Sequence, residues 1–192
     1  MPPNVNSYGT VAVALVLREP PVIHMNLHPI FVHFPIALLT IYTLLETASI
    51  IKRVRERAYI FYVKATFLLG GVFGAVPAYL TGDAQEGSAP VHTEFYRAMT
   101  VHSRWALATV LFFGALAAIH AAAWLCREWT GMPERLRKVL DLHRYATETA
   151  LTPVLALFGL CIVTVTGALG GALAYGSDID PTVSFIYKLL VK

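Results

Sequence analysis

Charged residues are scarce in this chain. Of its 192 residues only 14% are charged, whereas 56% are hydrophobic, and the mean hydropathy is +0.59. Soluble domains carry about a quarter charged residues, and disordered chains carry few apolar ones. The composition therefore excludes both classes and predicts a membrane protein.

Several motifs are also missing. The two cysteines, Cys126 and Cys161, have no CxxC spacing, which argues against a disulfide framework and a thiolate metal site. Neither GxSxG nor HExxH occurs, so a hydrolase is not indicated. The basic residues are not interleaved with aromatic ones in a soluble patch, so nucleic acid is not an expected partner. The lipid bilayer is the partner that the composition predicts.

Four apolar runs have the length of about 20 residues that a spanning helix needs. They predict spans at residues 29–51, 59–81, 101–126 and 150–175, within a transmembrane domain of residues 25–177. The alternating ten-residue patterns of a membrane barrel are absent. We therefore predict an all-α, polytopic membrane four-helix bundle with up-down-up-down topology.

The basic residues predict the orientation of this bundle, because lysine and arginine concentrate in cytoplasmic loops. They are abundant at 52–58 and 127–148, whereas the loop between the second and third spans holds only Arg97. Both termini are therefore expected on the outer side of the membrane.

The two ends of the chain are predicted to lie outside the spans. Residues 1–24 form an N-terminal extension that need not belong to the functional chain, because Met25 directly precedes the first span. Residues 178–192 predict an interfacial tail, in which Asp180 caps a helix that begins at Pro181.

Ionisable residues at membrane depth are candidate functional groups. Glu46 and Lys64 stand nine positions before and nine after Arg55, the centre of the first turn, so antiparallel packing places them at one depth. His120 lies at a similar depth in the third span. The cluster is interpreted either as a structural ion pair or as part of a functional relay.

A second cluster is predicted at the outer end. His33 lies about one turn into the first span and His102 near the outer end of the third helix. Because these helices are diagonal in such a bundle, the two imidazoles can face each other across the core. Small residues on the flanking helices would make room for haem b between them: Gly70, Gly71, Gly74, Gly167, Gly170 and Gly171. Alternatively, these glycines serve close helix packing.

A haem-free metal site is the other chemistry that the outer residues allow. Their nitrogen and oxygen atoms suit zinc, iron or manganese, although no HxxxH or ExxH pattern repeats on one helix. The candidate ligands are His28, His33, His92, His102, Asp83 and Glu86.

Three stretches of the chain carry a family resemblance: HPIFVHFPIALL from His28, HSRW from His102 and TGALGGALAYG from Thr166. They resemble a bacterial family known as domain of unknown function 2231, whose members are predicted four-helix membrane proteins. The resemblance covers residues 25–176 and implies a multi-pass protein of the bacterial inner membrane.

The resemblance also implies a redox setting, since some relatives are joined to Rieske-type or cytochrome c-type domains. In relatives whose fourth helix reads like GHxGGxxxHG, histidines stand where this chain has Ala168 and Tyr175. That departure leaves His33 and His102 as the remaining ligand pair.

These observations favour a small b-type cytochrome-like redox subunit that carries electrons near the outer face, between a quinone and a partner protein. An electron carrier or membrane subunit is expected rather than a stand-alone enzyme. The alternatives are a non-catalytic membrane anchor or subunit and a haem-free metal-binding membrane protein.

Overall fold

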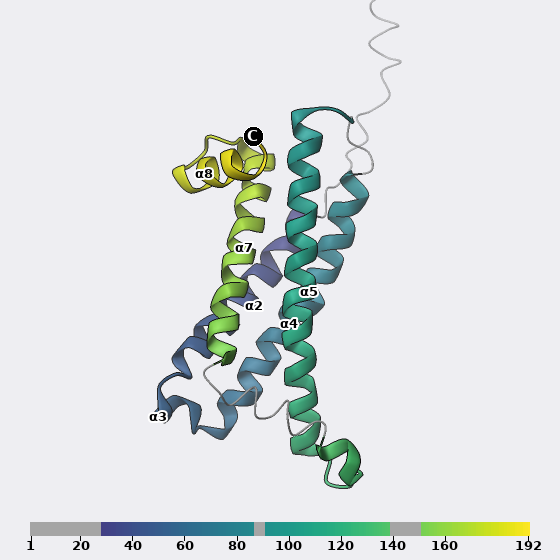
Figure 1. Ribbon diagram of the computed structural model, residues 1–192, viewed down its shortest axis with the longest axis vertical. Coiled ribbons are helices and arrows are strands. Elements are labelled where there is room, and N and C mark those ends of the chain that lie inside the picture. The colour runs from purple at the N-terminus through teal and green to yellow at the C-terminus, as the bar shows by residue number, and fades with distance from the viewer. Residues whose placement is uncertain (1–27, 87–90, 139–150) are drawn as a thin grey trace, which may run out of the picture.

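The computed structural model describes residues 28–86, 91–138 and 151–192 (Figure 1). The predicted extension at 1–24 lies outside the described residues. The helices are α2 (His28–Ala48), α3 (Lys52–Arg55), α4 (Ala58–Glu86), α5 (Glu94–Glu128), α7 (Leu151–Tyr175) and α8 (Pro181–Leu190).

Four of these helices, α2, α4, α5 and α7, are long and apolar enough to cross a membrane, and the described residues contain no strand. The predicted all-α class with four spans is confirmed. Consecutive long helices run in opposite directions, and each packs against the next, with α7 returning to α2 (Figure 1). In this arrangement α2 and α5 are diagonal to each other.

The helices extend beyond the apolar runs that predicted them. Helix α4 continues to Glu86, and α5 begins at Glu94, ahead of the apolar run at 101–126, as expected for a helix that starts near Thr93. Thr93 fixes this start, because its hydroxyl oxygen accepts a hydrogen bond from the Tyr96 amide at 3.0 Å. Hydropathy marks the lipid-facing length of a helix, and capping residues mark its ends.

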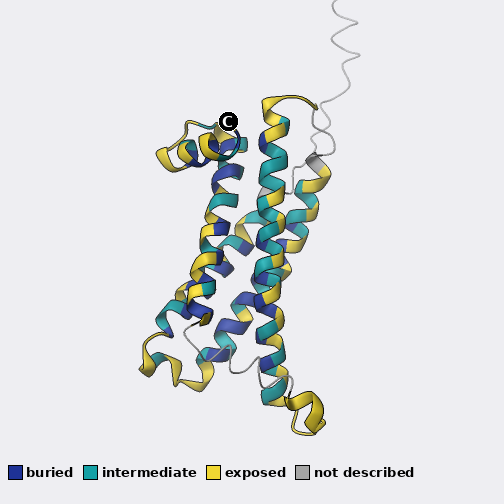
Figure 2. Ribbon diagram, viewed as in Figure 1, coloured by how far each residue is buried: buried dark blue, intermediate teal, exposed yellow. Residues whose placement is uncertain are grey.

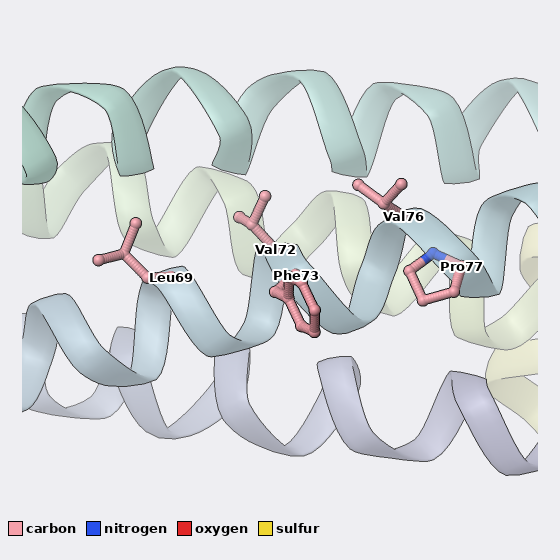
Figure 3. A pocket seen from close by; sticks show the side chains of 5 residues that line it. All are labelled: Leu69, Val72, Phe73, Val76 and Pro77. Atoms are coloured by element: carbon pink, nitrogen blue, oxygen red, sulfur yellow. The ribbon is translucent and has the colours of Figure 1, made fainter.

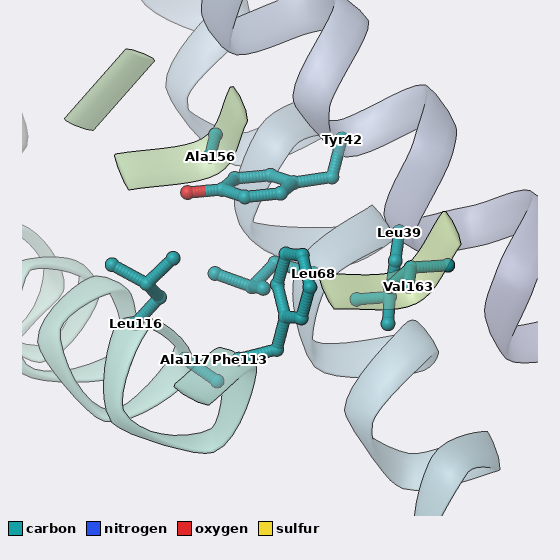
Figure 4. Close-up of a cluster of buried hydrophobic side chains, with 8 residues drawn as sticks. All are labelled: Leu39, Tyr42, Leu68, Phe113, Leu116, Ala117, Ala156 and Val163. Atoms are coloured by element: carbon teal, nitrogen blue, oxygen red, sulfur yellow. The ribbon is translucent and has the colours of Figure 1, made fainter. Parts of the chain in front are cut away.

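The core lies midway along the bundle and takes side chains from all four long helices (Figure 4). The ring of Tyr42 packs edge-on against Phe113, with centroids 6.3 Å apart. The outward faces are largely exposed and apolar, as in Phe73 at 81% exposure, which suits contact with lipid (Figure 2). The cluster consists of Leu39, Tyr42, Leu68, Phe113, Leu116, Ala117, Ala156 and Val163.

Helix α8 lies across the end of α7 and contacts the start of α5 (Figure 1). As predicted, Asp180 caps it, accepting hydrogen bonds from two main-chain amides of its first turn. Arg97 of α5 donates to the Val191 carbonyl at 2.8 Å, and the Tyr187 hydroxyl donates to Glu94 at 3.2 Å. Burial raises the pKa of Tyr187, and the Glu94 carboxylate raises it further.

Close contact between α2 and α4 depends on Gly71. A Cβ atom there would lie 2.6 Å from a Leu39 methyl carbon, and Leu39 is only 1% exposed, so it has little room to move. Around Gly167 nothing lies within 4 Å of such a Cβ.

We therefore expect Gly71→Ala to lower the free energy of unfolding by about 1–3 kcal/mol, the usual cost of overpacking a core. Gly167→Ala, the matched control in α7, should leave the free energy of unfolding unchanged or slightly higher. Denaturation of the purified protein in detergent, followed by circular dichroism, measures both. Equal effects of the two substitutions would contradict the tight α2–α4 contact.

Candidate functional site

Three ionisable side chains meet in the half of the bundle that contains α3. Glu46 of α2 accepts a hydrogen bond from Lys64 Nζ of α4, 2.9 Å from its Oε2. Its other oxygen, Oε1, lies 3.0 Å from His120 Nε2 of α5. The side chains of Glu46, Lys64 and His120 are 1%, 6% and 0% exposed. The structure thus brings together the three residues that the sequence places at one depth, here called the inner triad.

The inner triad links neighbouring and diagonal helices through one carboxylate. The pair between Glu46 and Lys64 follows from the α2–α4 hairpin, whereas the bond to His120 crosses to the diagonal helix α5. The remaining ring nitrogen of His120, Nδ1, lies 3.0 Å from the Leu116 carbonyl oxygen. Both nitrogens of this imidazole are therefore engaged.

Aromatic side chains surround the His120 ring. Tyr42 meets it edge-on with centroids 5.5 Å apart, and Phe61 lies parallel to it at 6.2 Å. The guanidinium carbon of Arg127 lies 3.8 Å from the Phe61 centroid. Sequence reasoning missed these three residues; the only signal was Tyr42, which stands one helical turn before Glu46 and so shares its face. Together they fix the imidazole plane.

At the opposite end, His28 joins α2 to α4. Its Nδ1 lies 3.1 Å from the Thr81 hydroxyl, and its ring occupies the space beside Gly82. Burial lowers the pKa of His28, although a backbone hydrogen bond at Ala78 acts against this. The imidazole is therefore neutral at pH 7 and contributes here to helix contact.

The two predicted haem ligands, His33 and His102, lie in different surroundings. His102 contacts α7: its Nδ1 is 3.1 Å from the Thr166 carbonyl oxygen, and a Cβ at Gly170 would lie 3.2 Å from its ring. Because a carbonyl oxygen can only accept, Nδ1 carries the hydrogen. His33 has an exposed side chain on α2.

The predicted cofactor glycines fall into two groups. Gly70, Gly71 and Gly74 of α4 face α2, where a Cβ would lie 3.3, 2.6 and 2.9 Å from its side-chain atoms. In α7, Gly170 adjoins His102, Gly167 has nothing within 4 Å, and Gly171 has only Val183 at 3.8 Å. Of the six, only Gly170 meets a predicted ligand.

The other proposed metal ligands do not converge in the described part of the chain. Asp83 and His92 have exposed side chains, and that of Glu86 lies outside the described residues. Among the residues that the structure describes, no three histidine, cysteine, aspartate or glutamate side chains stand close enough to hold a metal ion.

A bis-histidine haem requires two imidazoles that face one space. His102 fits in one respect, since a ligating histidine commonly donates its second ring N–H to a carbonyl. The exposed His33 and the α4 glycines covered by α2 do not fit. In the described residues the two imidazoles therefore do not face one space, and no reaction step is assigned to haem.

A shallow apolar hollow lies on α4, beside Pro77 (Figure 3). Proline has no N–H to donate to the carbonyl of Phe73, which locally interrupts the helical hydrogen bonds. The hollow is lined by Leu69, Val72, Phe73, Val76 and Pro77. It offers lipid contact and no polar chemistry, so the inner triad is the stronger candidate site.

Replacement of Glu46 tests the inner triad. Glu46→Ala removes both carboxyl oxygens and leaves Lys64 buried without its partner, so we expect the free energy of unfolding to fall by about 3–5 kcal/mol. Glu56→Ala removes an exposed lysine–glutamate pair, with Lys52 Nζ 3.6 Å from Glu56 Oε1, and should change the free energy of unfolding little. Denaturation in detergent compares the two; a loss below about 1 kcal/mol for Glu46→Ala would argue against a buried pair with Lys64.

One known family matches the chain. It is described as predicted membrane protein (DUF2231), and the match covers residues 24–182, including all four candidate spans. No curated protein and no solved structure gives a significant match. The match agrees with the resemblance at His28, His102 and Thr166, and with a multi-pass membrane protein. The chain therefore belongs to the DUF2231 family of predicted membrane proteins.

Proposed function

We propose that this protein is a non-catalytic, multi-pass subunit of the bacterial inner membrane, a scaffold whose helices are held at fixed positions. The observation that carries the proposal is that polar side chains join every adjacent pair of spanning helices. Their hydrogen bonds link helix to helix and do not converge on an open site.

One such contact joins each of the four adjacent pairs of spanning helices. Thr81 of α4 meets His28 of α2 at 3.1 Å, and the Tyr62 hydroxyl of α4 donates to Glu128 of α5 at 2.6 Å. Helices α5 and α7 are joined by the hydroxyls of Thr109 and Thr166 at 3.1 Å. Helices α2 and α7 meet at Thr43, whose single hydroxyl hydrogen is shared between the Leu39 carbonyl of its own helix at 3.0 Å and the Ala156 carbonyl of α7 at 3.3 Å.

Two of these contacts, Thr109 with Thr166 and Thr43 with Ala156, lie within the apolar spans, where water does not compete for them, and the other two lie at the helix ends. Interhelical hydrogen bonds in membranes contribute about 0.6–2 kcal/mol each, so several together hold the helices in register. The exposed surface is largely apolar and suits lipid, and α8 lies across the end of α7. A scaffold of this kind presents a fixed surface to a partner at the end that carries α8. The distribution of basic residues assigns this end to the outer side of the membrane.

A second candidate is the small b-type cytochrome-like redox subunit with haem b, carrying electrons between a quinone and an outer partner. The Nδ1 contact of His102 with the Thr166 carbonyl favours it, because ligating histidines commonly donate their second ring N–H in this way. Such a role would require the exposed side chain of His33 to become covered when haem binds.

Two replacements of His102 separate the candidates. Glutamine can still donate to the Thr166 carbonyl, whereas alanine cannot. For a scaffold we expect His102→Ala to lower the free energy of unfolding by about 1–2 kcal/mol and His102→Gln to restore most of it. If Gln and Ala lower stability equally, the hydrogen bond to α7 is not the role of His102.

The visible spectrum supplies the second measurement. Protein purified in mild detergent from a haem-replete host is compared as reduced-minus-oxidised spectra for wild type, His33→Ala and His102→Gln. The scaffold predicts identical spectra without haem bands. A bis-imidazole spectrum that is lost in both variants would reject the scaffold and establish the redox candidate.

A further inference from the structure

The hydrogen bonds of His120 determine how many protons the inner triad holds. The main-chain carbonyl oxygen of Leu116 can only accept, so His120 Nδ1, 3.0 Å away, carries a hydrogen. Nε2 stands 3.0 Å from Glu46 Oε1. A bare ring nitrogen and an ionised carboxylate both carry lone pairs and would repel each other, so a second hydrogen lies between them.

That hydrogen has two possible positions with the same proton count. On Nε2 it makes an imidazolium beside a carboxylate; on Oε1 it makes a carboxylic acid beside a neutral imidazole. In either position the Glu46–His120 pair holds one proton more than an ionised glutamate and a neutral histidine do in water. Lys64 donates separately to the other carboxyl oxygen, Oε2, at 2.9 Å.

We propose that Glu46 and His120 form a proton-binding site inside the membrane. The site takes up one proton from solution when the protein folds and, with the Lys64 ammonium, gives the inner triad one net positive charge. This inference stands apart from both candidate functions, because it rests on the inner triad and not on the outer histidines.

Aromatic and charged groups from three helices surround the site. Phe61 lies parallel to the imidazole with centroids 6.2 Å apart, and its ring also faces the Arg127 guanidinium, whose carbon lies 3.8 Å from the Phe61 centroid. The titratable and charged groups that face the site are Tyr42 on α2, Lys64 on α4 and, beyond Phe61, Arg127 on α5. Helix α7 carries no charged residue.

The proton count fixes the sign of a pH dependence. In the unfolded chain histidine loses its proton near pH 6.5 and glutamate near pH 4.3, so above about pH 7.5 neither holds it. In the proposed site the folded pair keeps this proton, so the native state would bind one more proton than the unfolded state. Stability therefore falls as pH rises, and the unfolding equilibrium constant increases about tenfold per pH unit.

His120→Gln removes the proton and keeps the rest of the inner triad. The glutamine amide donates to Glu46 Oε1 without any bound proton, and the pair with Lys64 remains. Unfolding of the full chain in detergent is measured from about pH 7.5 to 9. We expect the tenfold dependence per pH unit in wild type, its loss in His120→Gln, and its retention in the control His102→Gln. Parallel pH profiles of wild type and His120→Gln would overturn the proposal.

Nuclear magnetic resonance of the folded wild type gives an answer even if the variant fails to fold. Nitrogen-15 labels report the His120 ring and carbon-13 labels the Glu46 carboxyl, in detergent near pH 8. The expected result is an imidazolium with a carboxylate, or a neutral imidazole with a carboxylic acid. An ionised Glu46 beside a neutral His120 would overturn the proposal, since no shared proton would then be present.

Discussion

The buried carboxylate of Glu46 sets the register of three spanning helices. An ion in hydrocarbon needs compensating groups at contact distance. Here Lys64 Nζ at 2.9 Å and His120 Nε2 at 3.0 Å provide them from α4 and α5. One residue of helix is about 1.5 Å of rise, so a shift of either helix by a single residue would break one of these bonds. The aromatic packing of Tyr42 and Phe61 on His120 depends on that register.

The same bonds require α2 and α4 to lie close together, and the sequence of α4 provides for this. Its buried positions recur at steps of four and three residues, which places them on one face: Lys64, Leu68, Gly71, Ala75 and Ala78. After Lys64 and Leu68 the residues on this face are glycine and alanine, so the α2 side chains reach the α4 backbone. The charge pair specifies where the helices meet, and the glycine and alanine residues determine how closely they do so.

Depth could be predicted from the sequence, but rotation about the helix axis could not. Glu46 and Lys64 were correctly placed together because a short turn makes their helices neighbours and fixes both depths. In a soluble helix the polar face reveals which side is inward. These spans face lipid on one side and an apolar core on the other, so hydropathy hardly distinguishes the two. For that reason the exposed position of His33 and the direction of the α4 glycines were not foreseen, nor was the aromatic cage of His120.

The two ends of the bundle are electrostatically almost independent. His102 and His120 stand on α5 eighteen positions apart, or about 27 Å at 1.5 Å per residue, and the apolar core cluster lies between their levels. Even at an effective dielectric constant of about 20, unit charges at that separation interact by about 0.6 kcal/mol. That is less than half of the 1.4 kcal/mol that changes an equilibrium tenfold, so the charge of the inner triad hardly alters binding at His102. The inner triad therefore acts on the rest of the bundle mainly through helix register, and hardly through its charge.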